Sequence, residues 1–133
     1  MPAISVLMPC YNAAATLEET LQSIAAQSLA DFEVVAVDDG STDETAAILQ
    51  RWEQQDARFR FLPLPHGGII PAMNAGLQAC RAELVARMDA DDRMHPERLA
   101  AQVDFMAAHP EVDLVSSLVS GFPAGSLRET ADQ

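Results

Sequence analysis

Three carboxylates stand within four residues, directly after a short apolar run. The run covers residues 84–88, and the acids are Asp89, Asp91 and Asp92. This pattern predicts a buried strand followed by an acidic loop. If the chain stays extended, Asp89 and Asp91 point to the same side. Carboxylates crowded in this way need a cation or a shared proton between them, and oxygen-only ligands suit Mg²⁺ or Mn²⁺.

The same acids have a second interpretation that needs no metal. They precede a segment around Pro96 that is typical of a helix start. Carboxylates near a helix N-terminus stabilise it by about 0.3–1 kcal/mol each. An Asp-x-Asp pair also arises easily by chance in a chain with 20 acidic residues among 133. Taken alone, the acids leave both interpretations open.

Two further polar clusters follow apolar runs. Pro9, Tyr11 and Asn12 come after the run 4–8, and Asp38 and Asp39 come after the run 33–37. Tyr11 can stack on a nucleobase or close a strand-to-helix loop, and Asn12 is typical of a turn residue that bonds the backbone. A carboxylate at a strand end can accept a hydrogen bond from a base N–H or from ribose hydroxyls, or can cap the next helix. We favour a mixed role for the Asp38–Asp39 pair.

Strand and helix patterns alternate four times, which predicts the elements that position these clusters. The expected strands are 4–8, 33–37, 58–62 and 84–88, with a fifth from Val112. The expected helices start with a capping box at Thr16, start near Thr42 or Asp43, and cover 69–80 and 96–108. This order predicts an α/β fold of Rossmann-like type, a mostly parallel sheet with helices on both faces. All three polar clusters then lie along the carboxyl edge of the sheet, where such folds bind ligands.

Composition narrows the function classes. The formal net charge is −12 and 49% of the residues are apolar, so we expect one folded domain that does not bind nucleic acid as its main partner. The chain has no lysine, which excludes a P-loop and a Schiff-base mechanism. Cys10 and Cys80 are expected to be reduced, as in a cytoplasmic protein. No signal peptide and no membrane-spanning run are visible.

Several weaker candidates remain. Gly67–Gly68 before a helix can cradle phosphate, although the GxGxxG spacing is absent and we favour a flexible loop. His66 and His95 are interpreted as solvated loop histidines. Asn74 can reach the crevice or cap a helix, and the sequence leaves both open.

The order of these motifs resembles the inverting family 2 glycosyltransferases with a GT-A fold. The matching segments are 5–12, 37–43, 67–68, 73–76 and 86–92, followed by Pro96, Leu99, Gln102 and Val103. Each segment is weak alone, but together, in this order, they are specific. The resemblance extends over roughly residues 3–118.

The resemblance implies a hexosyltransferase that uses a nucleotide-diphosphate-sugar donor, commonly a UDP- or GDP-sugar, with Mg²⁺ or Mn²⁺. By match of position, Pro9, Tyr11 and Asp39 would surround the base. Asp89 would approach the ribose, and Asp91 would bind the metal that bridges the diphosphate. Asn12, Asp38 and Asn74 are further candidates for substrate binding. The implied acceptor is a carbohydrate or lipid-linked hydroxyl, as in polysaccharide biosynthesis.

Two departures from the family pattern stand out. Many members carry Arg where this chain has Met73, and Ala82 occupies a position where Gly is common.

The resemblance also implies where the general base lies. In the family this base follows the matched region, residues 119–133 offer no counterpart, and we expect it beyond Gln133. Residues 1–133 are therefore expected to form a single donor-binding domain that lacks the acceptor and base region. Such a domain would bind nucleotide but transfer little sugar, in the cytoplasm or at the cytoplasmic face of a membrane.

Two other classes of protein are weighed against this interpretation. A non-catalytic nucleotide-sugar-binding module fits the same motifs. A receiver-type signalling domain is also doubly wound and acidic at its strand ends. Receivers need a lysine near the last strand, and their acidic pair follows the first strand, where this chain has Pro9.

Overall fold

The predicted alternation of strands and helices is confirmed. The computed structural model describes residues 2–109, 119–120 and 127–128. The first eight elements are β1 (Ile4–Cys10), α1 (Ala14–Ala25), β2 (Phe32–Asp39), α2 (Thr45–Gln55), β3 (Phe59–Leu64), α3 (Ile69–Ala79), β4 (Val85–Arg87) and α4 (Arg98–Ala108). A separate antiparallel pair joins β5 (Val119–Ser120) to β6 (Leu127–Arg128). The start expected for a fifth strand, at Val112, lies outside the described residues.

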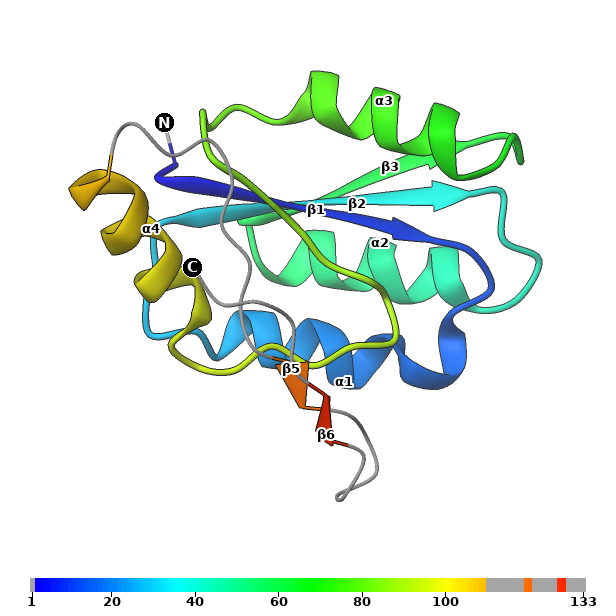
Figure 1. Ribbon diagram of the computed structural model, residues 1–133. Coiled ribbons are helices and arrows are strands. Elements are labelled where there is room, and N and C mark those ends of the chain that lie inside the picture. The colour runs from blue at the N-terminus through cyan, green and yellow to red at the C-terminus, as the bar shows by residue number, and fades with distance from the viewer. Residues whose placement is uncertain (1, 110–118, 121–126, 129–133) are drawn as a thin grey trace.

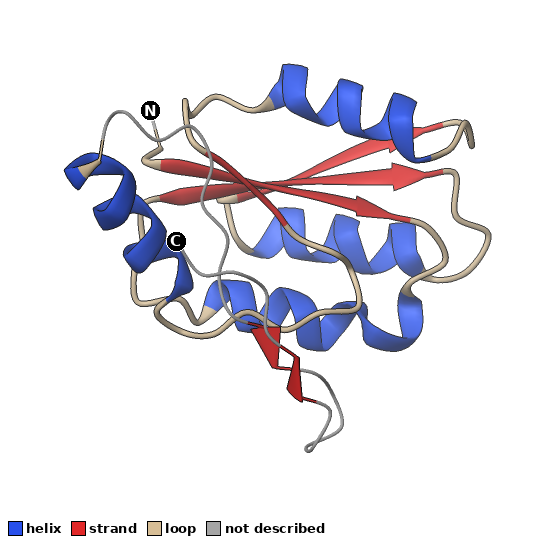
Figure 2. Cartoon of the chain, in the orientation of Figure 1, coloured by secondary structure: helices blue, strands red, loops and turns tan. Residues whose placement is uncertain are grey.

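The four main strands form one parallel sheet in the order β3-β2-β1-β4. Helix α3 covers one face of this sheet, and α1 and α2 cover the other (Figure 1). Colouring by secondary structure shows the same layers (Figure 2). The register places Cys10 beside Asp38, and Asp39 beside Leu64. The carboxyl ends of β1, β2 and β3 therefore lie at one edge, as the sequence predicts.

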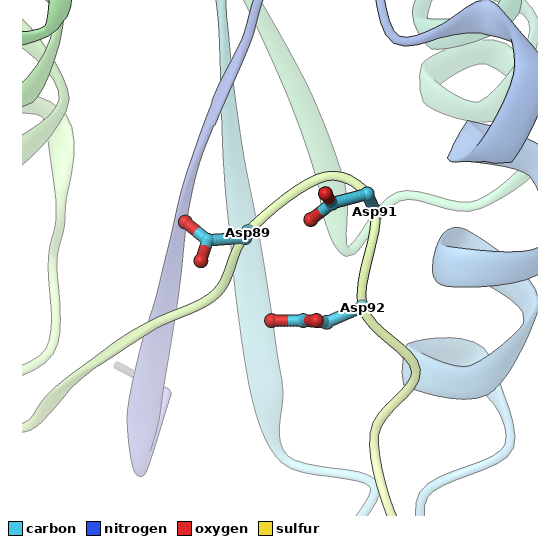
Figure 3. A group of neighbouring side chains, drawn as sticks. All are labelled: Asp89, Asp91 and Asp92. Carbon is cyan, nitrogen blue, oxygen red and sulfur yellow. The ribbon is translucent and has the colours of Figure 1, made fainter. Parts of the chain in front are cut away.

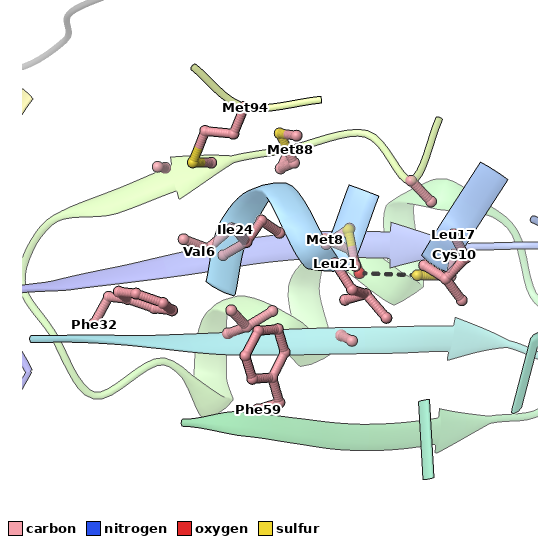
Figure 4. Close-up of a cluster of buried hydrophobic side chains, with 14 of the residues drawn as sticks. Val6, Met8, Cys10, Leu17, Leu21, Ile24, Phe32, Phe59, Met88 and Met94 are labelled. Carbon is pink, nitrogen blue, oxygen red and sulfur yellow. Dashed lines mark hydrogen bonds between the residues drawn. The ribbon is translucent and has the colours of Figure 1, made fainter. Parts of the chain in front are cut away.

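Two apolar clusters hold the layers together. Side chains of β1 and β2 alternate between them: Val6 and Val34 pack toward α1, whereas Leu7 and Val35 pack toward α3. The larger cluster, drawn in Figure 4, also receives Leu21 from α1. Because these strands are buried on both faces, their sequences are nearly continuous apolar runs.

The prediction of a buried strand over residues 84–88, before the acids, is wrong in the length of the strand and in its burial. The regular part, β4, has only three residues, Val85–Arg87, and its residues alternate between exposed and buried. Within β4 only Ala86 is buried in the core, and Val85 is 40% exposed. The physical reason is position, because β4 pairs only with β1 among the described strands and forms an edge of the sheet.

The predicted capping box at Thr16 is also wrong. Helix α1 begins at Ala14, and no side chain of its own N-cap residue bonds it. The first residue of α2 and the loop before it satisfy the first N–H groups of α1 instead: Ala13 donates to Thr45 Oγ1 at 2.9 Å, and Ala14 donates to Asp43 Oδ2 at 3.2 Å. Thr16 lies inside the helix, where its hydroxyl donates to the Ala90 carbonyl at 3.1 Å. Helix α4 similarly begins at Arg98 rather than at residue 96.

A buried carboxylate ties the amino ends of the strands together. The side chain of Glu33 on β2 is 2% exposed and lies 3.0 Å from the guanidinium groups of both Arg60 and Arg81. The Ser5 hydroxyl and the Arg81 backbone N–H also donate to it. Burial alone would raise the pKa of Glu33, but the hydrogen bonds from Ser5, Arg81 and Arg60 outweigh burial and lower the pKa to about 2.

The depressed pKa predicts an acid-sensitive fold. Glu33 has a lower pKa in the folded chain, about 2, than its ordinary value of 4.5, so its contribution is present above pH 4.5 and is lost as the pH falls toward 2. This shift corresponds to about 3 kcal/mol of stability at neutral pH. We expect Glu33→Gln to lower the free energy of unfolding by an amount of that order at pH 7. Chemical denaturation between pH 7 and pH 2 measures this, and the difference from the unmodified chain should shrink with acid.

A matched control separates this network from surface charge. Glu19 forms a loose pair with Arg93 at 3.8 Å, and its side chain is 68% exposed. Exposed pairs contribute only about 0–1 kcal/mol, so Glu19→Gln should change little at any pH. A gap between the unmodified chain and Glu33→Gln that stays constant from pH 7 to pH 2 would contradict the role given to Glu33.

Candidate functional site

A cleft of about 440 Å³ opens beside the carboxyl end of β1. Its volume lies in the range of small-molecule sites, about 300–1,000 Å³. Its walls come from the loop after β1, the start of α1, the start of α3 and the segment after β4. The lining residues are Pro9, Tyr11, Asn12, Ala13, Ala15, Thr16, Ile69, Arg87, Asp89, Ala90 and Asp91. Five of the eight predicted site residues are among them; Asp38, Asp39 and Asn74 are not.

The acidic loop gathers three carboxylates at this cleft. Single oxygens of Asp89, Asp91 and Asp92 lie within 4.8 Å of one another, and Figure 3 shows the three side chains around one turn. The chain is not extended here, because the Asp92 N–H donates to the Asp89 carbonyl at 3.2 Å. The expectation that Asp89 and Asp91 meet through an extended backbone is therefore wrong in its geometry. The turn brings in Asp92 as well, and the resulting all-oxygen set fits a hard divalent cation.

A cation, Arg87, also lines the cleft, and the sequence analysis missed it. Arg87 is the last residue of β4 and lies 2.9 Å from Asp89 through its guanidinium group. Both side chains are 49% exposed. The sequence contained one signal for this pair. Arg87 is two residues before Asp89, a spacing that places two side chains on the same side of an extended segment. Arg87 partly balances the acidic loop and places positive charge at the wall of the cleft.

Asn12 and Asp38 bond the backbone around the cleft. Asn12 has φ +50°, and its side-chain oxygen accepts the Thr42 N–H at 2.8 Å. The Asn12 N–H donates to the Ser41 hydroxyl at 2.9 Å, and Asp38 accepts the Ser41 N–H at 3.2 Å. These bonds join the loop after β1 to the loop after β2. The turn role expected for Asn12 is confirmed, whereas direct contact of either residue with a substrate stays a prediction.

Asp39 lies at the end of β2 with a fully bonded carboxylate. Oδ1 accepts the Gly67 N–H at 2.9 Å, and Oδ2 accepts the Gly68 N–H at 3.1 Å. Nδ1 of His66 lies 3.1 Å from Oδ2. The pKa of Asp39 is lowered, first by the Gly67 N–H, so the carboxylate stays ionised near neutral pH. The two glycine N–H groups bind Asp39, so they do not form the open phosphate cradle considered from the sequence.

Gly40 allows this loop to approach β2. It has φ +70°, and a Cβ at this position would lie 2.5 Å from the backbone nitrogen of His66. Any side chain there would have to displace backbone rather than a flexible side-chain end. Glycine at position 40 thus leaves space for the His66 backbone next to Asp39.

The Tyr11 ring stacks on His66. The two ring centroids are 4.5 Å apart with an angle of 24° between the planes, and Tyr11 is 48% exposed. The interpretation of His66 as a solvated loop residue missed this contact; only its place before Gly67–Gly68 hinted at a special loop. His95 accepts the Glu97 N–H at 3.1 Å and is not among the residues that line the cleft. Asn74 is an exposed residue of α3.

The remaining physical expectations concern cysteine and membranes. Cys10 and Cys80 are both free thiols, as predicted. Burial, followed by the charge of Asp38, raises the pKa of Cys10 to about 12, so this thiol is unreactive near neutral pH. None of the helices in the described part of the chain combines the length and apolar character needed to span a membrane.

The structure does not describe the position expected for the general base. It was expected beyond Gln133, and Gln133 itself lies outside the described residues. The position of the base therefore stays a prediction.

The sequence of this chain is similar to those of known proteins. Residues 5–133 match the family model described as glycosyl transferase family 2. The amylovoran biosynthesis glycosyltransferase AmsE of Erwinia amylovora is 39% identical over 122 residues, which cover 89% of this chain and 46% of AmsE. The putative teichuronic acid biosynthesis glycosyltransferase TuaG of Bacillus subtilis is 38% identical, over 79% of this chain and 42% of TuaG. The chain thus spans less than half the length of these relatives.

Solved structures agree with the sequence comparisons. The S. aureus TarS 1–349 structure in complex with UDP aligns with a TM-score of 0.74 and 32% identity, over 80% of this chain and 32% of the TarS 1–349 chain. The mannosyltransferase PcManGT of Pyrobaculum calidifontis, in complex with GDP-Man and Mn²⁺, aligns with a TM-score of 0.71 and 30% identity, over 90% of this chain and 35% of PcManGT. The parallel sheet, with the Asp89–Asp92 loop and Tyr11 at its carboxyl edge, is thus the GT-A arrangement, and the chain belongs to glycosyl transferase family 2.

Proposed function

We propose that this chain forms the donor-binding part of an inverting, metal-dependent hexosyltransferase. The observation that carries the proposal is the convergence of Tyr11, Asp89 and Asp91 on one cleft, from segments about 80 residues apart in the sequence. The cleft combines an aromatic ring for a base with carboxylates for a cation, which are the two ends of a nucleoside diphosphate. In the reaction, an acceptor hydroxyl would attack the anomeric carbon opposite the departing diphosphate.

The acidic loop is the proposed metal site. Asp91 would bind Mg²⁺ or Mn²⁺, with Asp89 and Asp92 close enough to share the ion. When bound, the ion would neutralise charge on the diphosphate. Arg87 would hold Asp89 in place through their ion pair and add positive charge at the cleft wall. Manganese in the PcManGT complex supports the choice of a divalent cation.

The donor is proposed to be a hexose nucleotide, with uridine as the first candidate base. TarS is described in complex with UDP-GlcNAc and PcManGT with GDP-Man, which are both hexose donors. The free thiols support a reducing compartment such as the cytoplasm. No observation favours the non-catalytic module over the enzyme, and a receiver domain would need the lysine that this chain lacks.

Calorimetric titration tests the proposal directly. We expect the chain to bind UDP or GDP with a clear dependence on Mn²⁺, because the carboxylates of the cleft repel a diphosphate until a cation lies between them. Titrations with and without Mn²⁺, and with EDTA added after saturation, measure this dependence. Absence of binding to either nucleotide by the folded chain in the presence of Mn²⁺ would overturn the proposed function.

A further inference from the structure

Tyr11 and Asp39 are both expected beside a bound nucleobase, and the imidazole of His66 contacts both of them. It stacks on Tyr11 with a centroid distance of 4.5 Å. Its Nδ1 lies 3.1 Å from both the carbonyl oxygen and Oδ2 of Asp39. Because both of these oxygens are acceptors, Nδ1 must carry the hydrogen and donate it. A flat nitrogen ring that stacks on Tyr11 and donates a ring N–H to Asp39 is what a bound uracil or guanine would present.

The carboxylate of Asp39 already accepts from three donors. It offers about four lone-pair directions, and the contacts from Gly67, Gly68 and His66 occupy both oxygens. The two glycine donors are backbone groups fixed by the loop. The imidazole is the one donor of the three that can leave by side-chain rotation. Of these three places on Asp39, the one held by His66 is therefore the one that a base can take.

We propose that the His66 side chain occupies the base position in the unliganded chain and that a bound nucleotide displaces it, so that His66 sets nucleotide affinity. This inference rests on the proposed function, because it names the group that competes with the base at that same site. The proposal explains why Asp39 does not line the cleft, although Asp39 contacts His66, the residue that stacks on Tyr11. His66 does not itself line the cleft, but Tyr11, on which it stacks, does.

Displacement needs little rearrangement. The His66 side chain is 57% exposed, so more than half of its surface already faces solvent. The loop backbone keeps its place, because the Gly67 and Gly68 N–H groups remain bonded to Asp39. The closed arrangement lowers the population of binding-competent chain, and apparent affinity falls in proportion to that population.

Substitution of His66 gives a result opposite to that of an ordinary binding residue. We expect His66→Ala to tighten UDP binding in the presence of Mn²⁺ by about three- to tenfold, the combined effect of one aromatic stack and one hydrogen bond after solvent competes for both. His109→Ala is the matched control, because His109 also stacks on a ring, Phe105, and bonds a carbonyl, but lies at the end of α4. The affinity of His109→Ala for UDP should equal that of the unmodified chain. Calorimetry with UDP and with GDP measures all three proteins.

A second measurement follows the imidazole itself. In the free chain the Tyr11 ring current should shift the His66 ring protons upfield in NMR spectra. UDP with Mg²⁺, used here in place of paramagnetic Mn²⁺, should move them toward solvent values as the site saturates. If the unmodified chain binds UDP but His66→Ala weakens binding or leaves it unchanged, the inference is overturned while the proposed function stands. If neither protein binds UDP or GDP, both are overturned.

Discussion

Replacing Asp91 with asparagine is expected to abolish the dependence of UDP binding on Mn²⁺ and to weaken binding at saturating metal by about 100-fold or more. Loss of a group that merely orients a metal ligand typically costs about 10–100-fold in affinity, so loss of a ligand charge should cost at least as much. Asparagine keeps the size of the side chain but removes the charge that attracts the cation. The measurement is calorimetric titration of UDP at several Mn²⁺ concentrations.

Two controls separate this effect from a change in fold or net charge. Asp104→Asn removes the same charge from an exposed position on α4 and should leave UDP binding unchanged. Without ligand, Asp91→Asn should melt at the same temperature as the unmodified chain or slightly higher, because it relieves repulsion within the acidic loop. If UDP binding is independent of Mn²⁺ in both the unmodified chain and Asp91→Asn, Asp91 has no metal-binding role, while the proposal that the chain binds nucleotide stands.

The convergence of the site could be predicted because it depends on topology rather than on side-chain detail. Apolar runs that alternate with helices imply parallel strands, and parallel strands place their carboxyl ends at one edge. The residues after β1 and β4, Tyr11 and Asp91, were expected to meet on that ground alone, and both line the cleft. The periodicity of the apolar residues and the order of strands and helices along the sequence were sufficient to predict this convergence.

The local start of α1 could not be predicted, because its capping groups are remote in sequence. Thr16 matched the capping-box pattern, yet Thr45 and Asp43 supply the acceptors for the first N–H groups of the helix. These residues are about 30 positions away and reach α1 only once the sheet has formed. A pattern confined to neighbouring residues cannot contain that information.

The loop around Asp39 shows the same limit at the site. Asp39 was expected to be free for a ligand, and Gly67–Gly68 were expected to form a separate flexible loop. Instead, Gly67 and Gly68 donate to Asp39, and His66 stacks on Tyr11. Gly40 makes this approach possible by leaving space for the His66 backbone. Two loops 27 residues apart thus form one unit, and the sequence indicates each loop but not their contact.

Asp39→Asn should change which base the chain prefers, in addition to weakening UDP. An ionised carboxylate accepts a ring N–H, which uracil presents at N3 and guanine at N1. Cytosine N3 and adenine N1 are acceptors and face the carboxylate with repulsion. We expect the substitution to weaken UDP binding by about 10–100-fold, the cost of losing one charge-assisted hydrogen bond. CDP binding should stay level or improve, because the new amide can donate to cytosine N3.

The ratio of UDP to CDP affinity distinguishes base recognition from simple loosening of the loop. Asp39 also holds Gly67 and Gly68, so the substitution removes loop contacts as well as a base contact. Loosening of the loop would weaken the binding of UDP and of CDP by the same factor and leave the ratio of their affinities unchanged. Loss of base recognition lowers the ratio, and the GDP-to-ADP ratio should fall in parallel for the same reason. Because each protein serves as its own reference, an unchanged ratio would show that Asp39 orders the loop without reading the base.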